Sequence, residues 1–199
     1  MSIKKNKARS PEISSLRIIG GRWRSRKIVF AEAPGLRPSG ERIRETLFNW
    51  LAPRINGAHC LDLYAGSGIL GLEALSRGAE SCTALDNNPA TIRHLQANCD
   101  LLNAELSIIN VNCINFLSNH KDDIRFDIVF IDPPFVEDLH TKSCLLLEQN
   151  GWLKDRALIY CELPSNDRSF VSPPNWQLQK DKRAGGVRYM LYTRFESMV

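Results

Sequence analysis

From residue 58 onward, short apolar runs alternate with stretches whose apolar residues recur at helical spacing. The apolar runs predict strands over 60–63, 82–86, 106–109, 126–131 and 157–163, and the stretches between and after them predict helices over 69–77, 89–102, 114–119 and 138–149. Repeated strand–helix–strand units form a parallel sheet with right-handed crossovers. The last segment differs, because 176–183 and 187–195 alternate around Gly185-Gly186, which is typical of an antiparallel hairpin. The pattern therefore predicts an α/β fold whose mostly parallel sheet ends in an antiparallel pair.

The net charge of +4 is unevenly distributed along the chain. Residues 1–54 hold thirteen Lys and Arg against four Asp and Glu, whereas residues 55–199 hold thirteen against eighteen. Basic charge gathered at one end of an otherwise acidic chain is typical of a protein that binds a polyanion. Residues 1–15 are charged and lack periodicity, which predicts a disordered basic tail. Residues 16–54 predict a folded, basic, RNA-binding extension, and residues 55–199 predict the main domain.

Within this extension, two short apolar runs and one amphipathic stretch are expected to be ordered. The runs at 16–19 and 27–30 predict strands, and the stretch at 41–51 predicts a helix. Ser39 is the expected N-cap of that helix.

Composition narrows the possible classes of protein. No apolar stretch approaches the length of a membrane span, and no apolar region follows the basic N-terminus as in a signal peptide. The six cysteines and four histidines show neither CxxC nor metal-ligand spacing, so we expect reduced thiols and no metal site. A cytoplasmic, monomeric protein is the resulting expectation.

A glycine-rich turn joins the first predicted strand of the main domain to its helix. Gly66, Gly68 and Gly71 satisfy the GxGxxG pattern, which permits a tight turn and close approach to a ligand. Asp86, twenty positions after Gly66, is placed to accept hydrogen bonds from ribose hydroxyls. Asp62 precedes the glycines and would repel a pyrophosphate but favour a cationic ligand. The turn therefore favours S-adenosylmethionine over a dinucleotide.

The run Asp132-Pro133-Pro134-Phe135 directly follows the apolar strand at 126–131. Proline lacks a backbone N–H and disfavours helix in the residue before it, so the strand must stop here. Ligands of open α/β sheets bind outside the carboxyl ends of the strands. A carboxylate, free carbonyls and a flat ring at this place suit a planar group that carries an amine, such as a nucleobase.

Together these motifs resemble class I S-adenosylmethionine-dependent methyltransferases that act on exocyclic amines. The resemblance is strongest to the RsmD-type family of bacterial 16S rRNA guanine-N2 methyltransferases, and it covers 16–195. Its most specific parts are 17–24, 37–39, 42–51 and 61–68. Two departures are mild: Ser39 stands where the family has Thr, and Asn112-Cys113 lacks the acidic residue typical after the third strand.

The resemblance implies a Rossmann-like, seven-stranded sheet, S-adenosylmethionine as cofactor, and a guanine of 16S rRNA in an assembled or nearly assembled small subunit as substrate. It implies cofactor contacts at Asp62, Tyr64, Gly66, Ser67, Gly68, Asp86, Asn87, Asn112 and Cys113. It implies RNA contacts at Arg17, Arg22, Trp23, Arg24, Arg37, Ser39, Arg42 and Arg44, with Trp23 either stacking on a base or packing inside.

The expected chemistry is an in-line methyl transfer in which positioning dominates. Asp132 would accept one N–H of the guanine amine and the Pro133 carbonyl the other, which orients the lone pair and stabilises the growing positive charge. Pro134 stiffens the corner, and Phe135 would stack on a base that is splayed out of its loop. Whether Asp132 also removes the proton stays open.

Three alternatives remain. An adenine-N6 methyltransferase would use the same tetrapeptide, so the motif does not choose between the two bases. A nicotinamide-dependent oxidoreductase would share the glycine pattern, but Asp62 and the prolines argue against it. A non-catalytic RNA-binding module would have no need for Asp62, Asp86 and Asp132 together.

Overall fold

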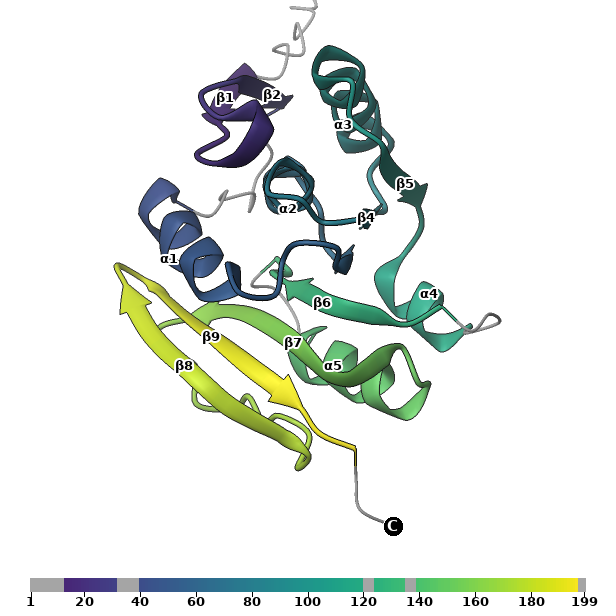
Figure 1. Cartoon of the computed structure of the whole chain (residues 1–199). Helices are drawn as coiled ribbons and strands as arrows, with labels where there is room; N and C mark the ends of the chain where they lie inside the picture. Colours follow the sequence, from purple (N-terminus) through teal and green to yellow (C-terminus); the bar gives the residue numbers. More distant parts are fainter. Residues whose placement is uncertain (1–12, 32–39, 120–123, 135–138, 197–199) are drawn as a thin grey trace, which may run out of the picture.

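The chain folds around one large sheet with helices on both faces (Figure 1). The computed structural model describes residues 13–31, 40–119, 124–134 and 139–196. In chain order the elements are β1 (Ile13–Arg17), the 3-10 turn η1 (Gly21–Trp23), β2 (Lys27–Ala31), α1 (Glu41–Leu51), β3 (His59–Asp62), α2 (Ile69–Ser76), β4 (Ser81–Asp86), α3 (Pro89–Leu102), β5 (Leu106–Asn110), α4 (Cys113–Ser118), β6 (Phe126–Ile131), α5 (Leu139–Gln149), β7 (Leu153–Pro164), β8 (Trp176–Ala184) and β9 (Val187–Arg194). Among the described residues, no helix is long and apolar enough to cross a bilayer.

The strand order confirms the predicted fold class. The large sheet has seven strands in the order β5-β4-β3-β6-β7-β9-β8. The pairs from β5 to β7 are parallel, whereas β9 runs antiparallel to both β7 and β8. The order reverses between β3 and β6, and ligands of open α/β sheets bind at such a switch point.

Two apolar cores cover the two faces of this sheet. One core contains side chains of α1, α2 and α3, and the other contains side chains of α4 and α5. In α1, Ile43, Leu47, Phe48 and Leu51 are buried on one stripe, as the helical spacing predicts. We call the face that α1 covers the α1 face.

Local signals in the sequence fix the ends of the longest helix. In α3, Asn88 caps the N-terminus by accepting a hydrogen bond from the backbone N–H of Ala90 at 2.9 Å, and Pro89 follows at the first helical position. Asn103 ends the helix in the left-handed conformation with φ 48°.

The N-terminal hairpin of β1 and β2 packs against α2 and α3 through buried polar contacts. The backbone N–H of Ile19 donates to the Glu73 carboxylate at 2.6 Å, and that of Trp23 donates to Ser76 Oγ at 3.0 Å. The side chain of Asn98 accepts from the Val29 N–H at 3.0 Å and donates to the Val29 carbonyl at 2.8 Å. Ile18, Trp23 and Ile28 belong to the same core as the helices, so the extension shares the core of the main domain.

The structure differs from the sequence prediction at three places. Residues 13–15, expected in the disordered tail, pair with 29–31 as part of β1. Strand β7 begins at Leu153 rather than 157, because its first part pairs with Phe126 on the far side of an irregularity in β6. The N-cap of α1 is Gly40, which corrects the expected Ser39. Ser39 itself lies outside the described residues.

Candidate functional site

The candidate site lies at the carboxyl ends of β3, β4 and β6, where the strand order reverses. Each of these strands places a carboxylate there. Asp62 ends β3, Asp86 ends β4, and Asp132 directly follows β6. Because β3 lies between β4 and β6, the sheet brings the predicted cofactor motif and the predicted acceptor motif to neighbouring strand ends.

The glycine turn between β3 and α2 requires glycine at its centre. Gly66 and Gly68 have φ values of 50° and 75°, in the left-handed region that side chains disfavour. A Cβ at Gly68 would lie 2.0 Å from Cδ2 of Leu95, so any other residue would also displace the Leu95 side chain. Gly68 is also the N-cap of α2, so this turn decides where the helix begins.

Asp86 holds the glycine turn and remains partly exposed. One carboxylate oxygen accepts a hydrogen bond from the Gly66 N–H at 3.0 Å, and the other accepts from the Asn88 N–H at 2.8 Å. Burial raises the pKa of Asp86, while the backbone donors act to lower it. An ionised carboxylate accepts about four hydrogen bonds, so both oxygens can take a further donor.

Asp62 lies beneath the glycine turn and is shielded from solvent. Its side chain is buried, and Oδ2 accepts a hydrogen bond from the Gly71 N–H in the first turn of α2 at 3.2 Å. Burial raises its pKa to about 7; the Gly71 hydrogen bond opposes this shift, and nearby Asp86 adds to it. The structure therefore shows Asp62 positioning the glycine turn. Its direct contact with a cofactor stays a prediction.

Four further predicted cofactor residues take different positions around this turn. Tyr64 is partly buried, and its hydroxyl lies 2.8 Å from Ser143 Oγ on α5. Ser67 is buried and Asn87 is exposed. Cys113 is buried in the second core, and burial raises the pKa of its thiol to about 11.

Asn112 has a structural role that the sequence analysis did not assign to it. Its side-chain oxygen accepts a hydrogen bond from the Asn115 N–H at 3.2 Å and so caps α4. The side chain is exposed, but its oxygen is engaged with the helix. Recognition of adenine by Asn112 stays a prediction.

At the acceptor corner, the exit from β6 has the predicted form. The strand ends at Ile131, and Asp132-Pro133-Pro134 follow without regular structure. Asp132 is partly buried, Pro133 is buried and Pro134 is exposed. Phe135 lies outside the described residues.

Sequence analysis did not identify Glu162, which lies on β7, the strand next to β6. Ile131 pairs with Cys161, so the next residues, Asp132 and Glu162, lie at the same level of the sheet. Glu162 is 3% exposed and accepts a hydrogen bond from the Tyr160 hydroxyl at 2.6 Å. A charged residue at the end of an apolar strand is the signal that could have identified it.

Of the six predicted RNA contacts that the structure describes in the basic extension, four lie at the surface. Arg17, Arg22, Arg24 and Arg42 are exposed. Trp23 is 8% exposed and belongs to the core, and the Arg22 guanidinium lies 4.2 Å from the centre of its ring. Trp23 therefore packs inside. Arg37 and Ser39 lie outside the described residues.

The position of Arg44 corrects its expected place on the RNA-binding surface. Its side chain is 1% exposed, and Nη1 donates to Glu73 at 3.0 Å and to the Arg17 carbonyl at 2.9 Å. Glu73 is fully buried and also binds Arg77 at 3.2 Å. Arg44 thus ties α1 to α2 and β1. A partner twenty-nine positions away could not be identified from helical periodicity.

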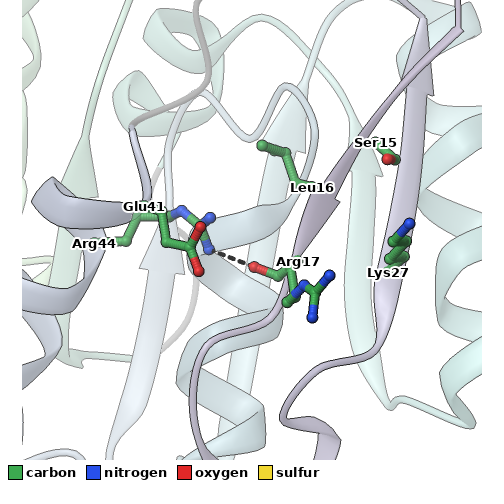
Figure 2. Close-up of a pocket in the computed structure, with 6 residues that line it drawn as sticks. All are labelled: Ser15, Leu16, Arg17, Lys27, Glu41 and Arg44. Atoms are coloured by element: carbon green, nitrogen blue, oxygen red, sulfur yellow. Dashed lines mark hydrogen bonds between the residues drawn. The ribbon is translucent and has the colours of Figure 1, made fainter.

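A pocket of about 420 Å³ opens between the N-terminal hairpin and α1 (Figure 2). It is lined by Ser15, Leu16, Arg17, Lys27, Glu41 and Arg44. Within this lining Arg44 donates to the Arg17 carbonyl (Figure 2), so α1 and β1 are joined there. Three cations face one carboxylate in this lining, which makes the pocket basic.

Known proteins resemble this chain over most of its length. The family described as Conserved hypothetical protein 95 matches residues 16–193. Ribosomal RNA small subunit methyltransferase D of Escherichia coli K12 is 48% identical over 180 residues, which cover 90% of each chain. The Haemophilus influenzae protein of the same name is 44% identical over 180 residues, 89% of this chain and 93% of its own.

Solved structures give the same result. The Escherichia coli methyltransferase yhhF superimposes with a TM-score of 0.82 at 46% identity, covering 92% of this chain and all of its own. The Thermus thermophilus 16S rRNA N2 G1207 methyltransferase RsmC, solved with AdoMet and guanosine, has a TM-score of 0.66 at 18% identity over 95% of this chain and 52% of its own. That distant likeness shows a common fold. The closer relatives show that this chain belongs to the ribosomal RNA small subunit methyltransferase D family.

Proposed function

We propose that the protein transfers a methyl group from S-adenosylmethionine to the exocyclic N2 of one guanine in 16S rRNA. Membership of a family of rRNA methyltransferases supports the reaction class. The observation that carries the proposal is the placement of Asp132-Pro133-Pro134 one strand away from the glycine turn held by Asp62 and Asp86. A site for the methyl donor and a site for the amine that accepts the methyl group would therefore lie side by side at the carboxyl ends of these strands.

The residues around the glycine turn fit S-adenosylmethionine better than a phosphate-bearing cofactor. The run from Asp62 to Gly71 contains no Lys or Arg, and the carboxylates of Asp62 and Asp86 lie below and beside it. S-adenosylmethionine carries an ammonium and a sulfonium and has no phosphate, so it meets no repulsion there. Asp86 would hold the ribose hydroxyls, and backbone groups of Gly66 and Gly68 would line the approach.

At the acceptor corner the protein orients an amine that is a poor nucleophile. When bound, S-adenosylmethionine supplies a methyl group already activated by its sulfonium. Asp132 accepts one N–H of the guanine amine, and the Pro133 carbonyl accepts the other. These bonds direct the nitrogen lone pair and stabilise positive charge as it develops. Phe135 stacks on the base, worth roughly 1–3 kcal/mol.

The same chemistry would serve adenine N6, so guanine is the finer part of the proposal. The Escherichia coli and Haemophilus influenzae relatives are named for small-subunit rRNA, which supports that substrate. The exposed Arg17, Arg22, Arg24 and Arg42 give the extension the charge needed to hold the RNA backbone. Backbone contacts position the enzyme and leave the choice of base to the acceptor corner.

The decisive experiment uses small subunits from a strain that lacks this protein, with labelled S-adenosylmethionine and mass analysis of the modified nucleoside. The wild-type protein is expected to yield N2-methylguanosine at one position. Asp132→Asn is expected to lower turnover by at least about a hundredfold, because one preorganised acceptor is worth roughly 10²–10³ in rate. Calorimetry is expected to show unchanged affinity for S-adenosylmethionine.

Asp100→Asn is the matched control, since Asp100 is an exposed carboxylate on α3. It is expected to behave as wild type. Unchanged turnover in Asp132→Asn would refute the role of the acceptor corner. N6-methyladenosine as the product would refute the choice of base while leaving the reaction class intact.

A further inference from the structure

The turn of the C-terminal hairpin lies at the same end of the sheet as the acceptor corner, where the parallel strands have their carboxyl ends. Strand β9 runs antiparallel to β7, with Glu162 opposite Tyr189 and Pro164 opposite Val187. Gly185-Gly186 therefore lies beyond the carboxyl end of β7, and the Ser165 N–H donates to the Gly186 carbonyl at 2.8 Å. In Figure 1 this turn lies beside α1. The hairpin thus brings residues from the end of the chain to the side of the site.

One row of residues crosses the sheet from the acceptor corner to the edge strand. Asp132 lies level with Glu162, Glu162 pairs with Tyr189, and Tyr189 pairs with Lys182. Three strand spacings make the Cα atoms of Asp132 and Lys182 about 14 Å apart.

The members of this row share the α1 face of the sheet. Tyr189 belongs to the core that contains α1. Strand alternation puts Asp132 on the same face as Phe130, which belongs to that core as well. The Lys182 ammonium lies 5.8 Å from the ring centre of Trp50 on α1. Lys182 and Asp132 therefore lie on one face, within reach of a single bound strand of RNA.

The hairpin gathers cations on a domain that is otherwise acidic. Lys180, Lys182 and Arg183 are exposed on β8, and Arg188 is the second residue of β9. Asp181 is the one carboxylate among them, and it binds Arg188 through two hydrogen bonds of 3.0 and 2.7 Å. Lys180 and Lys182 pair with Leu191 and Tyr189 of the core that contains α1, so both lie on the α1 face. Asp181, Arg183 and Arg188 lie on the opposite face.

An aromatic ring lies next to these cations. Trp50 is partly exposed and stacks on Tyr189, with ring centres 5.5 Å apart and planes inclined by 24°. Lysines beside a partly exposed aromatic ring are typical of surfaces that hold single-stranded nucleic acid. Trp50 fixes the hairpin against α1 and so fixes the cations relative to the site.

We propose that two lysines near the tip of the β8–β9 hairpin, Lys180 and Lys182, bind the phosphates of the rRNA strand that flank the target base. This proposal rests on the proposed function. It adds a second RNA contact to that of the N-terminal extension. The two contacts come from opposite ends of the chain and lie on the α1 face. RNA held at both would present the intervening nucleotide to Asp132.

A competing explanation is that the lysines protect an edge strand. Strand β8 is the outer strand of the sheet, and exposed lysines on such strands prevent pairing with other chains. That role predicts self-association when the charge is removed and no change in affinity for RNA. The RNA-binding role predicts a weaker affinity for RNA and no self-association.

The test is the double variant Lys180→Gln/Lys182→Gln, measured with small subunits from a strain lacking this protein. We expect KM for the subunits to rise about tenfold, as two phosphate contacts are lost, with kcat and affinity for S-adenosylmethionine unchanged. The slope of log affinity against log salt should fall by roughly 1.5, as for two contacts to a single strand. Light scattering should show a monomer.

Arg125→Gln is the matched control, because Arg125 is an exposed cation immediately before β6, at the amino end of that strand and so at the end of the sheet away from the site. It should leave KM and the salt slope unchanged. A wild-type KM and salt slope in the double variant would overturn the proposal, and self-association with wild-type RNA affinity would assign the lysines to edge protection.

Direct binding separates this proposal from the proposed function. The affinity of wild type and double variant for protein-depleted 16S rRNA, measured by filter binding without S-adenosylmethionine, does not depend on methyl transfer. If wild type methylates no RNA but the double variant still binds about tenfold more weakly, the proposed function fails and the hairpin surface stands. If wild type methylates the RNA and both proteins bind it equally well, the proposed function stands and the hairpin surface fails.

Discussion

The N-terminal extension and the C-terminal hairpin both contact the α1 face, but different interactions attach them. The extension is held by buried polar groups: Glu73, Ser76 and Asn98 bind its backbone. The hairpin is held by the backbone ladder between β7 and β9 and by apolar residues such as Met190. Buried polar bonds fix one position and are costly to break, whereas a ladder and an apolar face tolerate single changes. The extension should therefore be the more sensitive of the two.

The largest effect is expected for Glu73→Gln. Burial raises the pKa of Glu73 and lowers that of Arg44, so each charged form depends on its partner. Removing the carboxylate leaves Arg44 buried without its countercharge, which we expect to cost about 3–5 kcal/mol. Urea unfolding measures this loss. Glu80→Gln, at an exposed position just after α2, should change stability by less than about 0.5 kcal/mol. A loss below about 1 kcal/mol for Glu73→Gln would show that the buried pair is not what attaches α1.

A smaller effect is expected for Asn98→Ala, which removes both hydrogen bonds to Val29. Because the bonds are partly buried, the loss should be about 1–2 kcal/mol. The extension should also become more sensitive to limited proteolysis than the rest of the chain. Gln96→Ala changes an exposed residue of the same helix and serves as the control. Equal protease sensitivity of both variants would contradict attachment through Asn98.

Glu148 on α5 binds Trp176 and Arg194 of the hairpin, and Glu148→Gln is expected to cost about 1 kcal/mol. Burial acts to raise the pKa of Glu148, but hydrogen bonds from Arg194 and Trp176 outweigh it and hold the pKa below its usual range. A depressed pKa stabilises the fold above the pKa of the unfolded chain, about 4.3, and this contribution disappears as pH falls through the folded value. The stability difference from wild type should therefore shrink between pH 6 and pH 3. A constant difference would show that packing, rather than charge, is lost.

The smallest effect on stability is expected for Asp181→Asn. The Asp181–Arg188 pair at 2.7 Å is exposed, so solvent screening leaves it worth less than about 0.5 kcal/mol. Removing the carboxylate raises the positive charge of the hairpin tip, and RNA affinity at low salt should rise about twofold. Filter binding at two salt concentrations measures this change in RNA affinity. Unchanged affinity would argue against RNA contact at this tip.

The arrangement of the main domain could be predicted because its signals are local. The strand and helix periodicities, Pro89 at the start of α3 and the glycines after β3 each lie within a few residues of the structure they determine. The three carboxylates at the switch point follow from those elements, because parallel strands end at one edge of the sheet.

The remaining features depend on partners distant in the sequence. Arg44 lies on the buried stripe of α1 by its spacing from Leu47 and Phe48, but only its contact with Glu73 explains how a charged residue is buried there. Residues 13–15 form a strand because β2 pairs with them, not because of their own propensity. Glu162 gains its place beside Asp132 from the register between β6 and β7, which no local pattern reveals.

The contacts between Val29 and Asn98 also affect how the chain is made. These residues are 69 positions apart, and ribosomes add about 5–20 residues per second, so Asn98 is synthesised roughly 3–14 s after Val29. During that interval the basic hairpin can contact α2, through Glu73 and Ser76, but not α3. Synthesis from the N-terminus therefore leaves the packing of this segment incomplete until α3 emerges.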